Sequence, residues 1–539
     1  MTDQQPTLAH AARSGTAIGI AQVFSYAASF ALSLAIAATF GAGRTTDAYF
    51  MATSTAELLA KILLGGAVTS VLLPYFVAYL AKGNPARAWA LFSSLFSLAV
   101  VAFLVFGTTL QVFANGLVAF IAPGFSEETR LLTIVLLRLV FPAYLLSFLA
   151  DLAMVPLHAQ GRFGLPALSR LVVPVITLLA FLAFAGRIGI SVLAIGTLIG
   201  TAVQLVLLLL ALSRVGYTPT TRLWNPDLKR ILFLTLPFIL SILAAQGAGI
   251  VYRIFVSMEP EGSLASLKFS ERIFFIANTL FLGTIVQVSF PAFARAASTS
   301  LAEAQERLRT AFRLVTLAGI PLTVGLILLR TPLIRVLYER GAFTPEDTAA
   351  TALLVPFFVL GLLGNGWSSL LGHFVLAFQE TRTAVGVSVA LQAIAAGLFA
   401  LLVPSLGIVG LALVSGVGPL VLTTLYLWAF RARMPSLRVL FFNAYTGRLA
   451  LAGGICALLV TGVLWFARTV PPSTSTDLGT LLIAGIGGGG AYLLTAWLLG
   501  VPETGMVLRL LRQECTRMTN TVRTNLSLLG NGMMRRRLP

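Results

Sequence analysis

Residues 188–213 read IGISVLAIGTLIGTAVQLVLLLLALS and contain no charged side chain. Roughly 20 consecutive apolar residues are enough for a helix to cross the ~30 Å hydrocarbon core of a bilayer, since each adds about 1.5 Å. The stretch is longer than this minimum, and a charged residue, Arg214, follows it directly. The sequence therefore predicts a transmembrane helix here.

The composition extends this interpretation to the whole chain of 539 residues. Hydrophobic residues make up 58% of it and charged residues only 10%, and the mean hydropathy is +0.93. A soluble domain is about one quarter charged, so this composition excludes cytosolic enzymes, disordered proteins and secreted disulfide scaffolds. Two cysteines and three scattered histidines offer neither a disulfide framework nor a metal-ligand spacing. We expect an all-α polytopic membrane protein without a metal or a cofactor.

Stretches similar to 188–213 recur along the chain, separated by clusters of glycine, proline and charge. Together they predict about fourteen spanning helices. They lie near 15–40, 48–81, 88–120, 130–157, 164–186, 188–213, 230–257, 266–294, 308–329, 349–378, 384–404, 407–430, 448–468 and 478–500.

The charges outside the spans predict the orientation. Lys82 and Arg87 belong to one alternating set of loops, which carries most of the lysines and arginines, whereas Glu127, Glu128 and Glu346 belong to the other set. Cytoplasmic loops are enriched in Lys and Arg. An even number of spans then places both termini in the cytoplasm, and we expect no cleavable signal peptide. The net charge of +18 is explained by this topology and does not indicate a nucleic-acid partner.

An internal repeat divides the chain. GAVTSVLLPYF at 66–76 resembles GTIVQVSFPAF at 283–293, and PGFSEET at 123–129 resembles GAFTPED at 341–347 at almost the same offset. In the last of these, Thr344 has the pattern of a helix N-cap followed by a proline and an acid. Each repeat covers six spans, so the two copies are parallel and a substrate site is expected between them. The predicted parts are a first six-helix lobe at 1–222, a second lobe at 223–440, two further spans at 441–502 and a basic amphipathic tail at 503–539.

Six stretches spread along the chain carry a family resemblance. They are FGAGRTTDAYFMA at 40–52, APGFSEETRLL at 122–132, FPAYLL at 141–146, GRFGLPAL at 161–168, KFSERIFF at 268–275 and LYERGAFTPEDT at 337–348. They resemble the MurJ/MviN family, the lipid II flippases of the MOP exporter superfamily. The resemblance implies a transporter that is not an enzyme. Such a protein moves an undecaprenyl-pyrophosphate-linked sugar, preferably lipid II for peptidoglycan, across the bacterial cytoplasmic membrane by alternating access.

Charged residues within the spans are the candidate site. A pyrophosphate cannot cross hydrocarbon unaided, so the transporter must offer cations at membrane depth. The candidate substrate-binding cations of a cavity between the lobes are Lys61, Arg253, Arg272 and Arg138, and the candidate charge partners or gating acids are Glu57, Asp47 and Glu271. Glu57 and Lys61 also fit a self-neutralising pair on one helix face, and Arg138 and Lys268 fit side chains that reach the membrane interface.

The chain departs from the family pattern in its first span. Two arginines and an acid of the family fall on Tyr26, Leu32 and Ser33 here, and a later acid falls on Phe275. These departures keep an exopolysaccharide or O-antigen lipid-carrier flippase as the alternative function. A MATE-like antiporter for cations is disfavoured because its cavity needs acids, and a scaffold for cell-wall enzymes is a further alternative. The driving force, either the membrane potential or an ion, stays open, and so does contact with cell-wall synthesis proteins.

Overall fold

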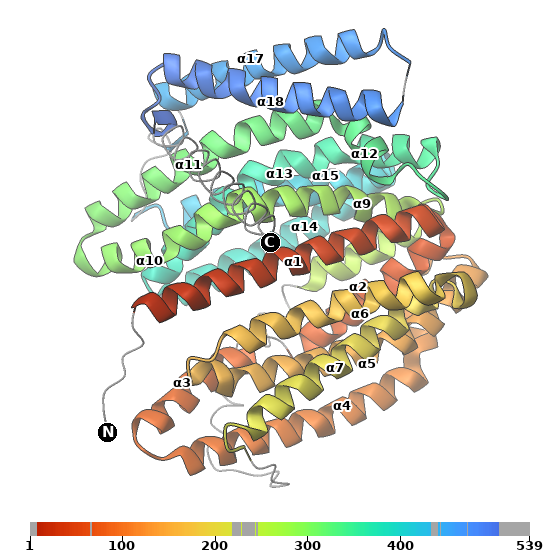
Figure 1. Ribbon diagram of the computed structural model, residues 1–539, viewed down its shortest axis with the longest axis vertical. Coiled ribbons are helices and arrows are strands. Elements are labelled where there is room, and N and C mark those ends of the chain that lie inside the picture. The colour runs from red at the N-terminus through yellow and green to blue at the C-terminus, as the bar shows by residue number, and fades with distance from the viewer. Residues whose placement is uncertain are drawn as a thin grey trace, which may run out of the picture. The chain divides into compact units, whose positions relative to one another are not determined.

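A computed structural model describes residues 8–64, 67–217, 228, 243, 246–432, 440–441, 443–471 and 473–505. Every regular element among these residues is a helix (Figure 1). The predicted tail lies outside the described residues beyond position 505. Most of the predicted span 230–257 also lies outside them, but its residues 246–257 are helical.

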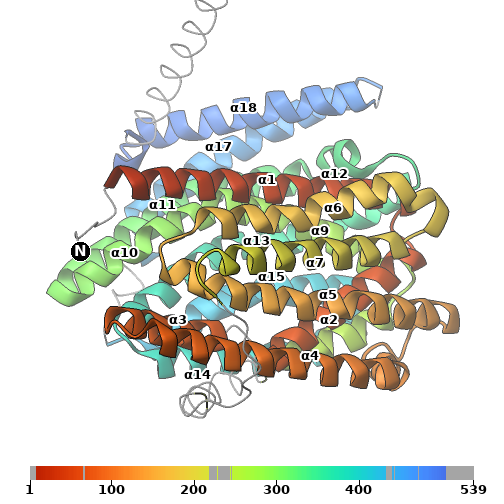
Figure 2. The same ribbon diagram turned by 60° about the horizontal axis from the view of Figure 1, so that its bottom comes forward.

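The helices follow the predicted spans closely. Up to residue 217 they are α1 (Leu8–Phe40), α2 (Arg44–Leu64), α3 (Ala67–Ala81), α4 (Pro85–Ile121), α5 (Glu127–Ala159), α6 (Gly164–Ile188) and α7 (Ser191–Ser213). From residue 263 they are α9 (Ser263–Ala277), the π-helical η1 (Asn278–Gly283), α10 (Thr284–Thr299), α11 (Leu301–Leu328), α12 (Arg330–Tyr338), α13 (Pro345–Ala377), α14 (Thr381–Leu406), α15 (Ile408–Ala429), α17 (Ala444–Ala467) and α18 (Thr474–Leu498). Figure 2 shows the same helices from a second direction.

Twelve helices of the described residues are long and apolar enough to cross a membrane. The all-α polytopic prediction is therefore confirmed. Within the predicted span 48–81, α2 ends at Leu64 and α3 begins at Ala67, and residues 65–66 lie outside the described residues. Of these two helices, α2 carries Asp47, Glu57 and Lys61 and is the more polar.

The start of α13 follows the predicted capping pattern. The Thr344 hydroxyl accepts a hydrogen bond from the Asp347 backbone N–H at 3.2 Å. In return, the Asp347 carboxylate accepts one from the Thr344 backbone N–H at 3.0 Å. Two N–H groups that have no intrahelical partner are thereby satisfied, and helix α13 begins at Pro345 for this local reason.

The helices form two compact units. Unit 1 comprises Met1–Ile273, Leu337–Phe358 and Val385–Gly418, and unit 2 comprises Phe274–Val336, Val359–Ala384 and Pro419–Pro539. The core of unit 1 includes an aromatic group in which Trp89 packs edge-on against Phe76 and lies 5.4 Å, centroid to centroid, from Tyr217. The predicted lobes at 1–222 and 223–440 are defined by the repeat, and their boundaries stay a prediction.

Unit 2 holds the last two predicted spans. Helices α17 and α18 lie side by side (Figures 1 and 2), and together with α11 they bury a core that includes Leu449, Cys456 and Tyr492. At Gly488 of α18, an added Cβ would lie 2.7 Å from a methyl group of Val460 on α17. A small residue is therefore needed where these two helices approach, as is common between helices in membranes.

Candidate substrate site

Asp47 joins two helices of unit 1 that are far apart in the sequence. Its carboxylate lies in the first turn of α2 and is 3% exposed. It accepts hydrogen bonds from the backbone N–H of Gly262 at 2.6 Å and of Ala265 at 2.7 Å. These N–H groups are at the start of α9, where a helix has no partners of its own and favours a negative charge. Asp47 therefore caps α9 from outside that helix.

Two glycines allow the backbone to approach closely near this cap. Gly262 has φ +88°, and a Cβ there would overlap the carbonyl oxygen of Ala42. Gly341 has φ +63°, and a Cβ would overlap the carbonyl oxygen of Ala38. Both positions combine a left-handed backbone with no room for a side chain, so only glycine fits without rearrangement.

Polar contacts connect the same loops further. Arg44 at the start of α2 forms an ion pair with Glu128 in α5. Glu261 accepts hydrogen bonds from the hydroxyls of Ser126 at 3.2 Å and Thr129 at 3.3 Å. These contacts and the Asp47 cap are called the end contacts below. They lie on the loops that the charge pattern predicts to face outward, and they hold the ends of α2, α5 and α9 together.

Glu259 lies in the same group of loops, beside the turn before α15. Its carboxylate accepts a hydrogen bond from the backbone N–H of Ile408. Partial burial raises the pKa of the Glu259 carboxyl, and the hydrogen bond acts in the opposite direction. The loop at 258–262 thus contacts α2 through Gly262 and Asp47, and it contacts α15 through Glu259 and Ile408.

Arg253 connects the helix at 246–257 with α2. Its Nη2 donates to the carbonyl oxygen of Ser54 at 2.6 Å, and its Nη1 donates to the carbonyl oxygen of Gly249 at 2.6 Å. The side chain is half-buried, and the acids close enough to act on its charge are Glu57 and Glu271. The charge of one predicted cation is therefore influenced by two of the predicted acids.

Glu57 and Lys61 form the ion pair that their spacing predicts. Lys61 Nζ lies 2.6 Å from Glu57 Oε1 on the same face of α2. The two side chains are about half exposed, at 49% and 54%. An exposed pair of this kind is worth less than about 1 kcal/mol, so another anion can replace the glutamate at little cost.

Lys268 is a cation that the sequence analysis placed at the membrane interface rather than in the site. Its Nζ lies 2.6 Å from Glu271 Oε2 and 6.0 Å from the centre of the Tyr252 ring. The K-x-x-E spacing of 268–271 was the signal for this contact, because residues three apart share a helix face. Lys268 therefore joins the same group of charges.

Arg272 follows on α9, half-buried. Its nearest acidic neighbour, Glu271, is engaged by Lys268, and its Nε is buried with no hydrogen-bond partner among the described residues. Arg138, on α5, is also half-buried. The contacts described for Arg138 connect its carbonyl oxygen to Gln111 at 3.1 Å, and none of them connects its side chain to the other candidates.

We group four cations and two acids of unit 1: Lys61 and Lys268 are in ion pairs with Glu57 and Glu271, both acids act on the charge of Arg253, and Arg272 is included because it is adjacent to Glu271 in α9. We name this group the cationic cluster, and its members are Lys61, Arg253, Lys268, Arg272, Glu57 and Glu271. It has two more positive than negative charges. No group of three metal-binding side chains occurs in the described part of the chain. Such a cluster suits the binding of a multiply charged oxyanion, since arginine offers paired donors to phosphate oxygens.

An all-helical membrane fold with cations held within its spanning helices is typical of proteins that move charged molecules across a membrane. The comparison with known families agrees with this class, since residues 36–477 match the family described as "Lipid II flippase MurJ". The chain belongs to this family, which is a family of transporters and not of enzymes.

The relatives have low sequence identity to this chain, but the matches cover most of both chains. A "Probable lipid II flippase MurJ" of Rickettsia prowazekii is 26% identical, and the match covers 70% of this chain and 75% of the relative. One of Rhizobium tropici is 24% identical over 92% of this chain and 96% of the relative. The "Lipid II flippase MurJ" of Burkholderia cenocepacia is 24% identical, and the match covers 74% of this chain and 79% of the relative.

Solved structures share the fold. A lipid II flippase MurJ in an inward closed conformation superposes with a TM-score of 0.75 at 22% identity, covering 89% of this chain and 98% of the other. An inward-facing MATE transporter of the MOP superfamily superposes with a TM-score of 0.66 at 15% identity, covering 76% and 94%. These superpositions agree with the predicted all-α polytopic fold.

Proposed function

We propose that this protein is a flippase that moves lipid II, the lipid-linked precursor of peptidoglycan, across the bacterial cytoplasmic membrane. The observation that carries the proposal is membership of the MurJ family over most of the chain. The cationic cluster supports it, because the diphosphate of lipid II is a multiply charged oxyanion that needs cations at membrane depth.

In the proposed mechanism, the cationic cluster binds the diphosphate. Arg272 and Arg253 contact it through their guanidinium groups, with Arg138 as a further predicted contact. The diphosphate displaces Glu57 from Lys61, and this exchange costs little because the pair is exposed. Binding then favours closure of the two six-helix lobes around the headgroup, and release follows when they open on the other side.

The remaining parts of the chain have proposed roles in this cycle. Helices α17 and α18 provide a lipid-facing groove for the polyprenyl tail. Both termini lie in the cytoplasm, and the basic tail contacts the anionic surface of the inner leaflet. The membrane potential or an ion drives the cycle, and proteins of cell-wall synthesis are the expected partners. The end contacts belong to the outward side and keep that side closed.

Complementation tests the proposed function. The full chain is expressed in a bacterium depleted of its own lipid II flippase, at an abundance checked by immunoblotting. We expect restored growth and normal cell shape. Loss of rescue by a correctly inserted protein would contradict the proposal.

The second candidate is a flippase for another lipid-linked oligosaccharide, favoured by the uncharged residues Tyr26, Leu32 and Ser33 in the first span. The same plasmid is placed in a strain that lacks an O-antigen flippase. Restored O-antigen without rescue of the lipid II flippase strain would support this candidate.

A further inference from the structure

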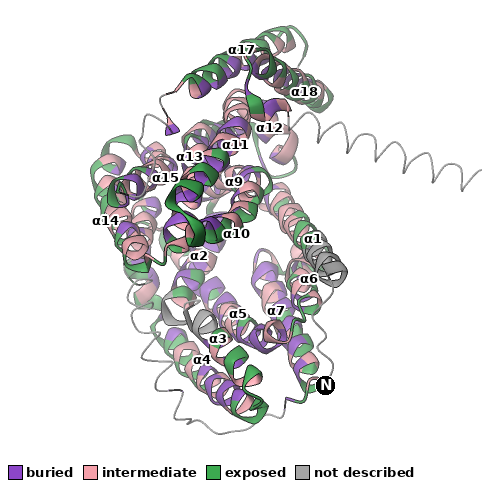
Figure 3. Cartoon of the chain, turned by 90° about the vertical axis from the view of Figure 1, so that its left-hand side faces the viewer, coloured by how far each residue is buried: buried purple, intermediate pink, exposed green. Residues whose placement is uncertain are grey.

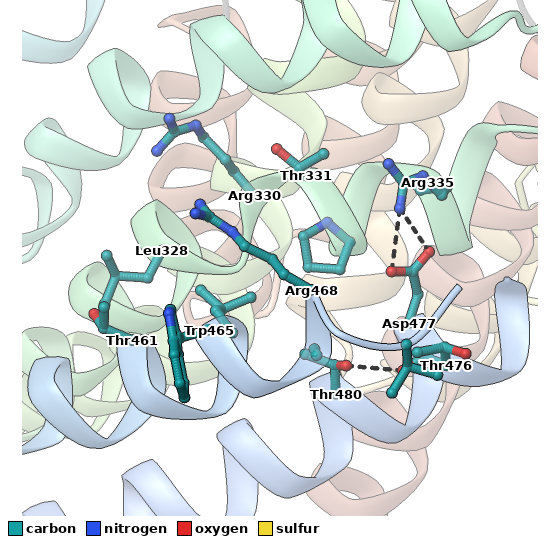
Figure 4. Close-up of a pocket in the computed structure, with 14 residues that line it drawn as sticks. Leu328, Arg330, Thr331, Arg335, Thr461, Trp465, Arg468, Thr476, Asp477 and Thr480 are labelled. Carbon is teal, nitrogen blue, oxygen red and sulfur yellow. Dashed lines mark hydrogen bonds and ion pairs between the residues drawn. The ribbon is translucent and has the colours of Figure 1, made fainter. Parts of the chain in front are cut away.

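A second charged cavity lies in unit 2, where α11 ends, α12 begins and α17 meets α18. Its volume is about 620 Å³, and it shares no residue with the cationic cluster. Figure 4 shows three arginines along it, Arg330, Arg335 and Arg468, together with Asp477 of α18. These helix ends are among those that the charge pattern predicts to face outward.

One of the three arginines is neutralised within the cavity. Arg335 Nη1 lies 3.0 Å from Asp477 Oδ2 and 3.2 Å from Oδ1, and the Asp477 side chain is 11% exposed. Arg330 donates to the carbonyl oxygen of Ile327 at 2.9 Å, and Arg468 is exposed. For Arg330 and Arg468, the described residues provide no carboxylate within ion-pair distance. The cavity therefore has two positive charges in excess.

The two arginines are placed to share one ligand. Both line the cavity, and in Figure 4 their guanidinium groups extend to the same side while Arg335 turns to Asp477. Guanidinium groups donate paired hydrogen bonds to phosphate oxygens. The hydroxyls of Thr331 and Thr476, also on the cavity wall, can bond polar groups beside a phosphate.

An apolar face leads away from the cavity along α17. Leu458, Thr461 and Trp465 follow the spacing of one helix face, and Thr461 and Trp465 line the cavity. Leu458 is 75% exposed and Trp465 is 71% exposed, and Figure 3 shows further exposed residues along α17 and α18. Tryptophan at the end of a spanning helix is typical of the membrane interface. A ligand of this site therefore has an anionic head and an apolar tail.

We propose that this cavity binds the phosphodiester head group of an anionic phospholipid. Arg330 and Arg468 contact the phosphate, Trp465 lies beside the glycerol, and an acyl chain follows α17 past Leu458. A phosphodiester carries one negative charge, which Arg330 and Arg468 can contact together while Arg335 stays paired with Asp477.

Binding of defined lipids to the full chain in detergent tests this inference. The probes are phosphatidylglycerol, phosphatidylcholine, undecaprenyl diphosphate and water-soluble glycerol phosphate, and bound molecules are counted by native mass spectrometry. We expect phosphatidylglycerol to bind more tightly than phosphatidylcholine. Arg468→Gln should weaken phosphatidylglycerol binding about tenfold, since it removes a charge-assisted contact. Arg330→Gln should have a similar effect.

The matched control is Arg187→Gln, an exposed arginine at the end of α6 that does not line this cavity. It should leave lipid binding unchanged, and a thermal unfolding curve for each variant checks that the fold is kept. Equal binding of the two phospholipids, or equal effects of Arg468→Gln and Arg187→Gln, overturns the inference. Binding of glycerol phosphate as tightly as the lipid, or preference for undecaprenyl diphosphate, also overturns it. None of these readouts depends on transport.

Discussion

The Asp47 cap and the cationic cluster both place charge among the spanning helices of unit 1, but they hold it differently. Asp47 is almost completely buried, and backbone N–H groups of α9 satisfy both of its carboxylate oxygens. In the cationic cluster, Lys61 and Glu57 are about half exposed and are paired only within one helix turn.

This difference distinguishes a charge that stabilises the fold from charges that are available to bind a substrate. The partners of Asp47 are fixed by the fold, so removing its carboxylate leaves buried donors without an acceptor. Both ion pairs of the cationic cluster join residues within one helix turn, and the Lys61–Glu57 pair is about half exposed, so an incoming anion can replace Glu57 without unfolding the helix. We therefore expect mutations at Asp47 to change stability and mutations in the cationic cluster to change transport.

The largest expected effect is the loss of transport in Arg272→Ala. Glu271, the acid adjacent to Arg272, is engaged by Lys268, and alanine removes the guanidinium that we propose to bind the substrate phosphate. The variant should insert at normal abundance but fail to rescue a strain depleted of its lipid II flippase. Arg272→Lys should rescue in part, because lysine keeps the charge and loses the paired donors. Normal rescue by Arg272→Ala at wild-type abundance would refute the role given to the cationic cluster.

Asp47→Ala should produce the largest change in stability. Two buried N–H groups at the start of α9 lose their acceptor, which costs about 3 kcal/mol in the free energy of unfolding. Unfolding of the purified protein in detergent by denaturant measures this change. Asp47→Asn retains one acceptor oxygen and should lose less. Equal stability of Asp47→Ala and the wild type would show that the cap is not structural.

A smaller effect is expected at Lys61. A flippase-depleted strain that carries Lys61→Ala should grow several-fold more slowly than one that carries the wild type. The free energy of unfolding should change by less than about 1 kcal/mol, because the ion pair of Lys61 is exposed. Glu57→Gln, the matched partner variant, frees Lys61 and should keep transport or increase it. If Lys61→Ala lowers stability as strongly as Asp47→Ala, the contrast between the two regions fails.

The last prediction concerns which side of the membrane the end contacts face. Single cysteines at Ser126 and Thr344 should react with an impermeant thiol reagent added to intact cells, and one at Asn84 should not. Each is introduced where Cys456 and Cys515 have been replaced by serine. Labelling of the Asn84 position in intact cells would place the end contacts on the cytoplasmic side.

The sequence was enough to predict the helices because hydropathy is a local property. The prediction of a span at 130–157 matches α5, and the capping pattern at Thr344 matches the start of α13. Contacts between residues that are far apart in the sequence could not be predicted from local patterns. Asp47 and Gly262 are 215 positions apart, and Arg253 and Ser54 are 199 apart, so only the packed fold brings them together. Lys268 was missed although its spacing to Glu271 was visible, because its charge was interpreted without its partner.

Transbilayer movement of lipid II in proteoliposomes tests the central claim most directly. The full chain is purified and reconstituted, and the fraction of fluorescent lipid II that reaches the opposite leaflet is followed with time. The wild type should move lipid II faster than protein-free vesicles, and Arg272→Ala should move it at the protein-free rate. Movement at the protein-free rate by the wild type, or at the wild-type rate by Arg272→Ala, would contradict the claim that the cationic cluster carries the diphosphate across the membrane.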